Sequence, residues 1–147
     1  MSIKDKENSA VQTHINILQN IISRMANNSA NAKTWCITIV SAIIALLFDK
    51  NKTGLAYIAL IPVAMFFFLD CYYLGLERFF RKQYNVFVLN LDGDSFQYAM
   101  VYKLIGPAGF FANLKNTIGG LFSFSTIPYY GIIVVLVLII RKLVNAG

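Results

Sequence analysis

One segment constrains this chain more than any other: LAYIALIPVAMFFFLDCYYLGL, residues 55–76, in which Asp70 is the only charged residue. A helix of roughly 20 mostly apolar residues is long enough to cross the hydrocarbon core of a bilayer. We therefore expect a membrane-spanning helix over this segment. Pro62 predicts a kink that neighbouring helices have to accommodate.

Two further segments reach spanning length. TWCITIVSAIIALLF, residues 34–48, does so if its helix begins near Ser29, which is a suitable N-cap residue. IGGLFSFSTIPYYGIIVVLVLII, residues 118–140, stops at Arg141 and Lys142. The polar DKNKTG, residues 49–54, predicts a turn between the first two spans.

The composition favours a membrane protein over a soluble one. The chain is 57% hydrophobic and 14% charged, whereas an average soluble domain carries about 25% charged residues. The soluble alternative is a fold with three buried core helices, but a chain of 147 residues has too little polar surface to cover them. We expect an all-α membrane protein with three transmembrane helices.

The basic residues favour a cytosolic N-terminus, because cytosolic flanks of membrane spans are enriched in Lys and Arg. Of the 13 Lys and Arg residues, this orientation leaves only Lys50, Lys52, Arg141 and Lys142 outside. Those on the cytosolic side are Lys4, Lys6, Arg24, Lys33, Arg78, Arg81, Lys82, Lys103 and Lys115.

The spans divide the chain into four parts. These are a cytosolic amphipathic helix (1–28), a transmembrane helical hairpin (29–80), a small cytosolic insert (81–116), and a third transmembrane helix with a short tail (117–147). In the insert, YNVFVLNL (84–91) and SFQYAMVY (95–102) flank DGD, which is a signal for a β-hairpin. A helix over QYAMVYKL (97–104) is the alternative.

The N-terminal helix carries an apolar seam with alternating spacings of four and three residues, as in a coiled coil. Its members are Val11, Ile15, Leu18, Ile22 and Met25. The opposite face is poor in Lys and Arg, which disfavours a helix that lies on lipid. We expect the seam to pack in a bundle, either within one protomer or between the protomers of a homo-oligomer, with a tetramer favoured.

Asp70 lies about 25 Å along its span from Thr53, at about 1.5 Å per residue, and thus near the cytosolic exit. Two interpretations stay open. Asp70 is an interfacial carboxylate paired with a base, or Asp70 and Glu77 belong to a charged ring at the inner mouth of a pore. Glu77 and Arg81 have the i,i+4 spacing of a helical ion pair.

The first span carries a stripe of small and hydroxylated residues on one face: Thr34, Thr38, Ser41 and Ala45. Such a stripe allows close packing of helices, and it can also line a narrow hydrated path. Because one protomer with three short spans cannot enclose a water path, a pore requires a ring of protomers.

The sequence contains no catalytic or metal-binding constellation. A phosphate-binding loop, HExxH and a nucleophile elbow are all absent, and the cysteines, Cys36 and Cys71, lie within apolar runs. We expect no enzyme activity, no metal site and no cofactor. Two function classes remain: a channel or pore subunit, and a non-conducting membrane scaffold that anchors a cytosolic partner.

Two stretches carry a resemblance to known proteins: HINILQNIISRMANNSANAKTW (14–35) and LFSFSTIPYYGI (121–132). They resemble motifs of small bacterial membrane proteins, whose plan is similar to that of transmembrane effectors in anti-phage defence, such as the channel subunit of Hailong-type systems. The resemblance implies a bacterial inner-membrane effector. It also implies a nucleotidyltransferase partner whose nucleotide or oligonucleotide product controls that effector.

Five basic residues of the insert and its approach would form a positive cytosolic collar in a ring of protomers: Arg78, Arg81, Lys82, Lys103 and Lys115. Anchoring to anionic lipid is one role for them. The other is to bind a polyanionic nucleotide or short single-stranded DNA, with Tyr84, Phe96 or Tyr98 as a stacking face.

Overall fold

The computed structural model describes residues 9–49, 53–91, 103, 105–106 and 126–145 of the chain. Its elements are α2 (Ser9–Asp49), the 3-10 helix η1 (Thr53–Ala59), α3 (Leu60–Leu91) and α5 (Thr126–Asn145). The described part of the chain contains no β-strand, in agreement with the expected all-α class.

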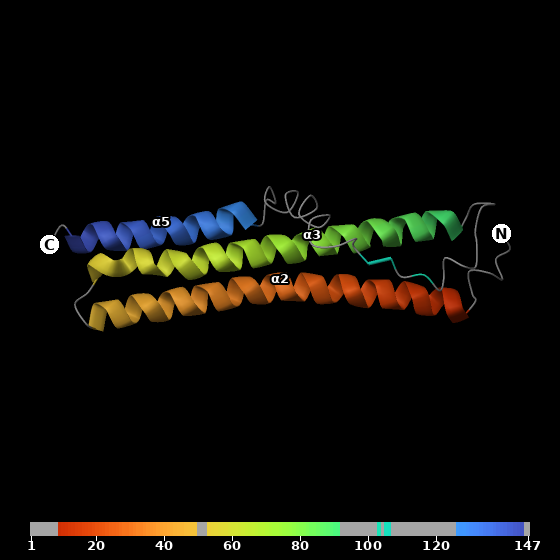
Figure 1. The fold of residues 1–147 in the computed structure, drawn as a ribbon, viewed down its shortest axis with the longest axis horizontal. Helices are drawn as coiled ribbons and strands as arrows, with labels where there is room; N and C mark the ends of the chain where they lie inside the picture. Colours follow the sequence, from red (N-terminus) through yellow and green to blue (C-terminus); the bar gives the residue numbers. More distant parts are fainter. Residues whose placement is uncertain (1–8, 50–52, 92–102, 104, 107–125, 146–147) are drawn as a thin grey trace.

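The two long helices define the shape of the molecule. α2 and α3 lie antiparallel and side by side over their whole length (Figure 1). The much shorter α5 covers only the half that contains the end of α2 and the beginning of α3 (Figure 1). In the part of the chain that the structure describes, one half therefore has three helices and is here called the bundle, and the other half has two and is here called the hairpin.

The bundle has its own apolar core, to which all of its helical segments contribute. The buried members are Cys36, Val40, Ala59, Val63, Tyr130, Ile133 and Val137. Many large apolar side chains on the outer surface of the bundle remain exposed: Trp35, Leu46, Ile61, Met65, Phe68, Ile132 and Leu136. Two helical stretches, Ser9–Asp49 and Leu55–Leu91, are long and apolar enough to cross a membrane.

The hairpin is closed by the N-terminal seam, which packs against α3 of the same chain. Val11 is fully buried against Phe87 and Leu91, and the ring of His14 lies 4.4 Å from that of Phe87, measured between centroids. Leu18 and Met25 are also buried, while Ile15 and Ile22 are half-buried. Of the two packings expected for the seam, the structure contains the one within the protomer.

The N-cap expected at Ser29 is wrong, because α2 continues through this position as one helix. The boundary between residues 28 and 29 therefore falls within a helix. Nothing in NNSANAK breaks a helix, and the seam carries on through it. Val11, Leu18, Met25 and Ala32 recur at every seventh position and are all buried, so burial against α3 favours helix without interruption.

The first strand of the expected β-hairpin is also wrong. Residues 84–91 belong to α3, and the second expected strand, 95–102, lies outside the described residues. Val, Phe and Leu favour strands only weakly, and tertiary context commonly overrides this preference. Phe87 and Leu91, four residues apart, share the helix face that packs on Val11, and the burial of this face explains the helix.

The hairpin core yields a matched pair of substitutions. Leu18→Ala removes a side chain that is 1% exposed, and Leu89→Ala makes the same change at a side chain that is 73% exposed. We expect Leu18→Ala to lower the free energy of unfolding by about 2–5 kcal/mol, since it leaves a cavity. Loss of helical circular dichroism in mild detergent measures the effect. An equal shift for Leu89→Ala would contradict the described packing.

Candidate functional site

A buried cluster of polar side chains joins α2 and α3 where the bundle meets the hairpin. Asp70 has no exposed surface. The Ser29 hydroxyl donates a hydrogen bond to its Oδ1, and the Lys33 ammonium lies 2.6 Å from its Oδ2. Lys33 Nζ also donates to Ser29 Oγ, at 3.2 Å. The contact with Oδ2 is an ion pair without the alignment of a hydrogen bond.

The positions of these residues follow from the helix period. Ser29 and Lys33 are four residues apart on α2, so that their side chains lie one above the other on one face. Asp70 lies opposite them on the antiparallel α3. A buried carboxylate is tolerated only where it is paired and hydrogen-bonded. The cluster meets both conditions with residues from the chain itself.

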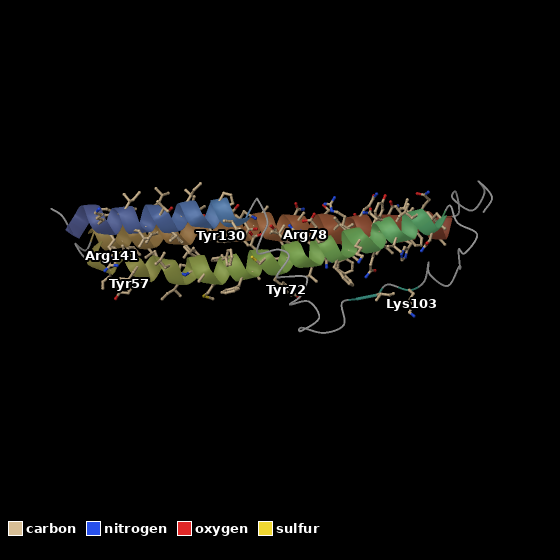
Figure 2. The ribbon with its side chains drawn as sticks, turned by 90° about the horizontal axis from the view of Figure 1, so that it is seen from above. Tyr57, Tyr72, Arg78, Lys103, Tyr130 and Arg141 are labelled. Atoms are coloured by element: carbon tan, nitrogen blue, oxygen red, sulfur yellow. The ribbon has the colours of Figure 1, made fainter. Side chains whose placement is uncertain are left out.

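The third helix meets α2 and α3 at the same level of the molecule. Tyr129 of α5 donates its hydroxyl hydrogen to the carbonyl oxygen of Lys33, at 2.6 Å. Tyr130, labelled in Figure 2, donates to the carbonyl oxygen of Phe66, at 3.1 Å. Lys33 therefore contacts Asp70 through its ammonium and α5 through its carbonyl group, and it links all three helices.

α5 begins at the buried Thr126. Its hydroxyl has no hydrogen-bond partner among the described residues. Thr126 lies about one helical turn before Tyr130, and Asp70 about one turn beyond Phe66. Since Tyr130 bonds to Phe66, this places Thr126 close to the level of Asp70.

Of the two interpretations of Asp70, the structure agrees with the paired carboxylate. The base is Lys33 of α2. Glu77 forms a separate pair with Arg81, at 2.5 Å between Oε1 and Nη2, which confirms the i,i+4 prediction. Asp70 is enclosed within the single chain that the structure contains, and Glu77 is paired with Arg81. A charged ring formed by Asp70 and Glu77 of several protomers stays a prediction.

Lys33 was not among the candidate site residues, although a signal for it was present. The i,i+4 spacing of Ser29 and Lys33 indicates two polar side chains on one helix face. The signal carries weight only once α2 is known to be continuous. If the helix is assumed to start at Ser29, Lys33 has the position of an ordinary basic residue that flanks a membrane span.

The basic residues proposed to bind a ligand are only partly brought together. Arg78, Arg81 and Lys82 are exposed within two turns of α3 on the hairpin. Lys103 is exposed as well, but it lies further along the hairpin than Arg78 (Figure 2). Its neighbour Ile105 accepts a hydrogen bond from Gln83 of α3, at 2.7 Å. Lys115 lies outside the described residues, as do the stacking candidates Phe96 and Tyr98.

The small-residue stripe faces away from the protomer. Thr34, Thr38, Ser41 and Ala45 are all exposed. The Thr34 hydroxyl donates to the carbonyl oxygen of Ala30, at 3.2 Å, and that of Thr38 donates to Thr34, at 2.8 Å. Neither α3 nor α5 covers this face. The stripe thus offers a surface that a second copy or water can meet.

Within the part of the chain that the structure describes, no three His, Cys, Asp or Glu side chains come together as metal ligands. Both cysteines are buried and free. Comparison with known proteins found no matching family model, no matching curated protein and no matching solved structure.

The ion pair yields a prediction with a matched control. We expect Lys33→Met to lower the stability of the helical unit by about 3–5 kcal/mol, since it leaves the buried Asp70 carboxylate without its partner. Asp70→Asn should lower it by less, since 17% of the Lys33 side chain is exposed and its ammonium can turn towards water. The double variant Lys33→Met with Asp70→Met should recover most of this loss, because a buried pair can be replaced by apolar side chains at little cost. Thermal unfolding in detergent measures all three.

Glu77→Gln is the control. It removes a carboxylate from the same helix, but the partner of that carboxylate, Arg81, is mostly exposed. Exposed pairs contribute little to stability, so its transition should match that of the unmodified chain. A double variant that is less stable than Lys33→Met alone would show that Lys33 and Asp70 do not act as a pair.

Proposed function

We propose that this chain is a subunit of an oligomeric membrane channel or pore-forming effector. The observation that carries the proposal is the exposed stripe of Thr34, Thr38, Ser41 and Ala45 on the apolar half of α2. Such a stripe of small and hydroxylated side chains lets the helix of another protomer approach closely, and its hydroxyl oxygens can also face a water path.

The proposed placement puts the bundle in the membrane with three spans: the second half of α2, η1 with the first half of α3, and α5. From Asp49 back to Ser29, α2 covers about 30 Å, the thickness of a hydrocarbon core. The exposed apolar surface of the bundle supports this placement. The Asp70 cluster then lies at one boundary of the membrane, and the hairpin projects beyond it.

In the proposed orientation the N-terminus and the hairpin are cytosolic, at the inner membrane of a bacterium. The exposed bases Arg78, Arg81 and Lys82 on the hairpin agree with the enrichment of basic residues on that side. At the opposite end, Arg141 lies over the ring of Tyr57, with its guanidinium carbon 5.9 Å from the ring centroid. Aromatic side chains of this kind are common at membrane boundaries.

Reporter fusions test the three-span placement. A reporter after Lys6 should be active in the cytosol, and one after Gly147 should be active on the outer side, since an odd number of spans places the ends on opposite sides. The protein should also resist extraction by carbonate. A cytosolic signal at Gly147 would contradict the proposed role of α5 as a span.

The proposed assembly is a ring, with a tetramer as the favoured form, in which the stripe of one protomer meets its neighbour or the water path. The proposed regulation of the channel follows from the resemblance to anti-phage effectors. A partner nucleotidyltransferase makes a nucleotide or oligonucleotide, and exposed bases on the hairpin bind it. The exposed Arg78, Arg81 and Lys82 support this by charge alone.

Ion flux through liposomes that contain the purified protein tests conduction. We expect flux above that of empty liposomes, and we expect Thr38→Phe to reduce it strongly, because a large ring on the stripe blocks either the path or the assembly. The matched control, Leu46→Phe, alters an exposed apolar residue away from the stripe and should conduct normally. Thr38→Val separates the two roles: a packing face tolerates it, whereas a water path loses a hydroxyl.

The same liposomes test the ligand. Short single-stranded DNA or a cyclic oligonucleotide should change the flux with a steep dependence on salt, and Arg81→Ala with Lys82→Ala should weaken that response without a change in oligomer size. Flux equal to that of empty liposomes in every condition would favour the alternative, a non-conducting scaffold that docks a cytosolic partner. The exposed Val86 and Leu89 on the hairpin are the observation that supports this alternative.

A further inference from the structure

The cluster of Ser29, Lys33 and Asp70 lies where the number of described helices changes from three to two. On one side, α5 completes the bundle core; on the other, α2 and α3 are the described helices that continue (Figure 1). Both helices run through this level without a break. α2 extends about 36 Å from Lys33 to Ser9, and α3 about 32 Å from Asp70 to Leu91, at about 1.5 Å per residue. A displacement of the hairpin therefore acts directly on the cluster.

The two partners of the ion pair differ in their access to water. Asp70 is fully buried, whereas 17% of the Lys33 side chain is exposed. A lysine at a membrane boundary can turn its ammonium towards water while its methylene groups stay in place. Asp70 cannot make the equivalent move. If Lys33 leaves, the carboxylate has to be met by water or a proton, since an isolated buried charge is strongly unfavourable.

The structure contains the arrangement in which Lys33 contacts Asp70. The alternative arrangement would have the ammonium in water, with water at the level of Asp70 and Thr126. Tyr129 bonds to the Lys33 carbonyl oxygen, so that α5 meets α2 at the residue whose ammonium pairs with Asp70.

We propose that the Lys33–Asp70 pair is a latch that closes the inner end of the bundle to water, and that movement of the hairpin releases it. This deepens the proposed function, because it names the contact through which a ligand on the hairpin would act on the membrane part. The test of the latch measures the access of water to Cys71, whereas the test of conduction measures ion flux. The latch and the proposed conduction can therefore fail separately.

Cys71 provides the readout. It follows Asp70 in the sequence and is fully buried, and Cys36 is the only other cysteine. In a Cys36→Ala background, the protein in lipid nanodiscs is exposed to a small charged methanethiosulfonate reagent. The reagent reacts with the thiolate, which forms only where water reaches the thiol. The rate of modification of Cys71 is measured at several pH values, so that a change in the thiolate fraction caused by the missing charge is separated from a change in how often the latch is open.

The charge variants make up the first arm of the experiment. We expect slow modification in the parent, and modification faster by about tenfold or more in Asp70→Asn and in Lys33→Met, because each leaves its partner charge to recruit water. The charge-free double variant, Lys33→Met with Asp70→Met, should be slow again. Glu77→Gln is the control and should match the parent. Two results would overturn the latch: modification of Cys71 at the parent rate in the single variants, or modification in the double variant that is as fast as in the single variants.

The second arm tests the link to the hairpin. Leu18 lies about 22 Å from Lys33 along α2, and Leu18→Ala loosens the hairpin core without altering the cluster. We expect faster modification of Cys71 in Leu18→Ala, and the parent rate in Leu89→Ala. A parent rate in Leu18→Ala would mean that the hairpin does not drive the pair, and the proposal would fail. The ellipticity and elution volume of each variant show that the protein is folded.

Discussion

A carboxylate that the fold excludes from water has to find its counter-charge within the chain. Asp70 has no exposed surface, and the chain provides Ser29 for one of its oxygens and Lys33 for the other. This requirement fixes how α2 and α3 align, because a slip of one turn would separate the carboxylate from the ammonium and leave both unpaired. The energetic penalty for such a slip is several kcal/mol. The alignment in turn brings the Lys33 carbonyl group to Tyr129 and so fixes the place of α5.

The two ion pairs of α3 have opposite characters, although they lie only two turns apart. Asp70 pairs with another helix in a buried site, so its loss affects the packing of the whole unit. Glu77 pairs with Arg81 on its own helix, and the Arg81 side chain is 60% exposed. Exposed pairs contribute little to stability and are screened by salt. Arg81 can therefore exchange Glu77 for an anionic partner at small cost, whereas loss of the Lys33 contact leaves the Asp70 carboxylate buried and without its counter-charge.

Patterns that depend on neighbours along one helix could be predicted from the sequence. The all-α class, the long apolar helix that contains residues 60–76, the apolar seam from Val11 to Met25 and the Glu77–Arg81 pair all belong to this kind. The features that were missed depend on a second helix. The local sequence around Ser29 and in residues 84–91 does not indicate that α2 and α3 pack against each other at these positions. Without that packing, a good N-cap residue and a run of strand-forming residues are the stronger local signals. The partner of Asp70 was missed for the same reason, since Lys33 lies on the opposite helix.

The packing of the bundle limits where a conducting path can lie. The interior of the protomer is filled by Cys36, Val40, Val63, Tyr130 and Val137, and the polar groups at its inner end are mostly bonded to one another. A close-packed apolar core has no room for a chain of water molecules. In the proposed channel, the path for ions therefore has to run between the protomers of the proposed ring, along a surface that each of them presents. On the apolar half of α2 that surface is the stripe from Thr34 to Ala45, where the hydroxyl groups of Thr34 and Thr38 already donate to their own helix and keep lone pairs that can accept from water.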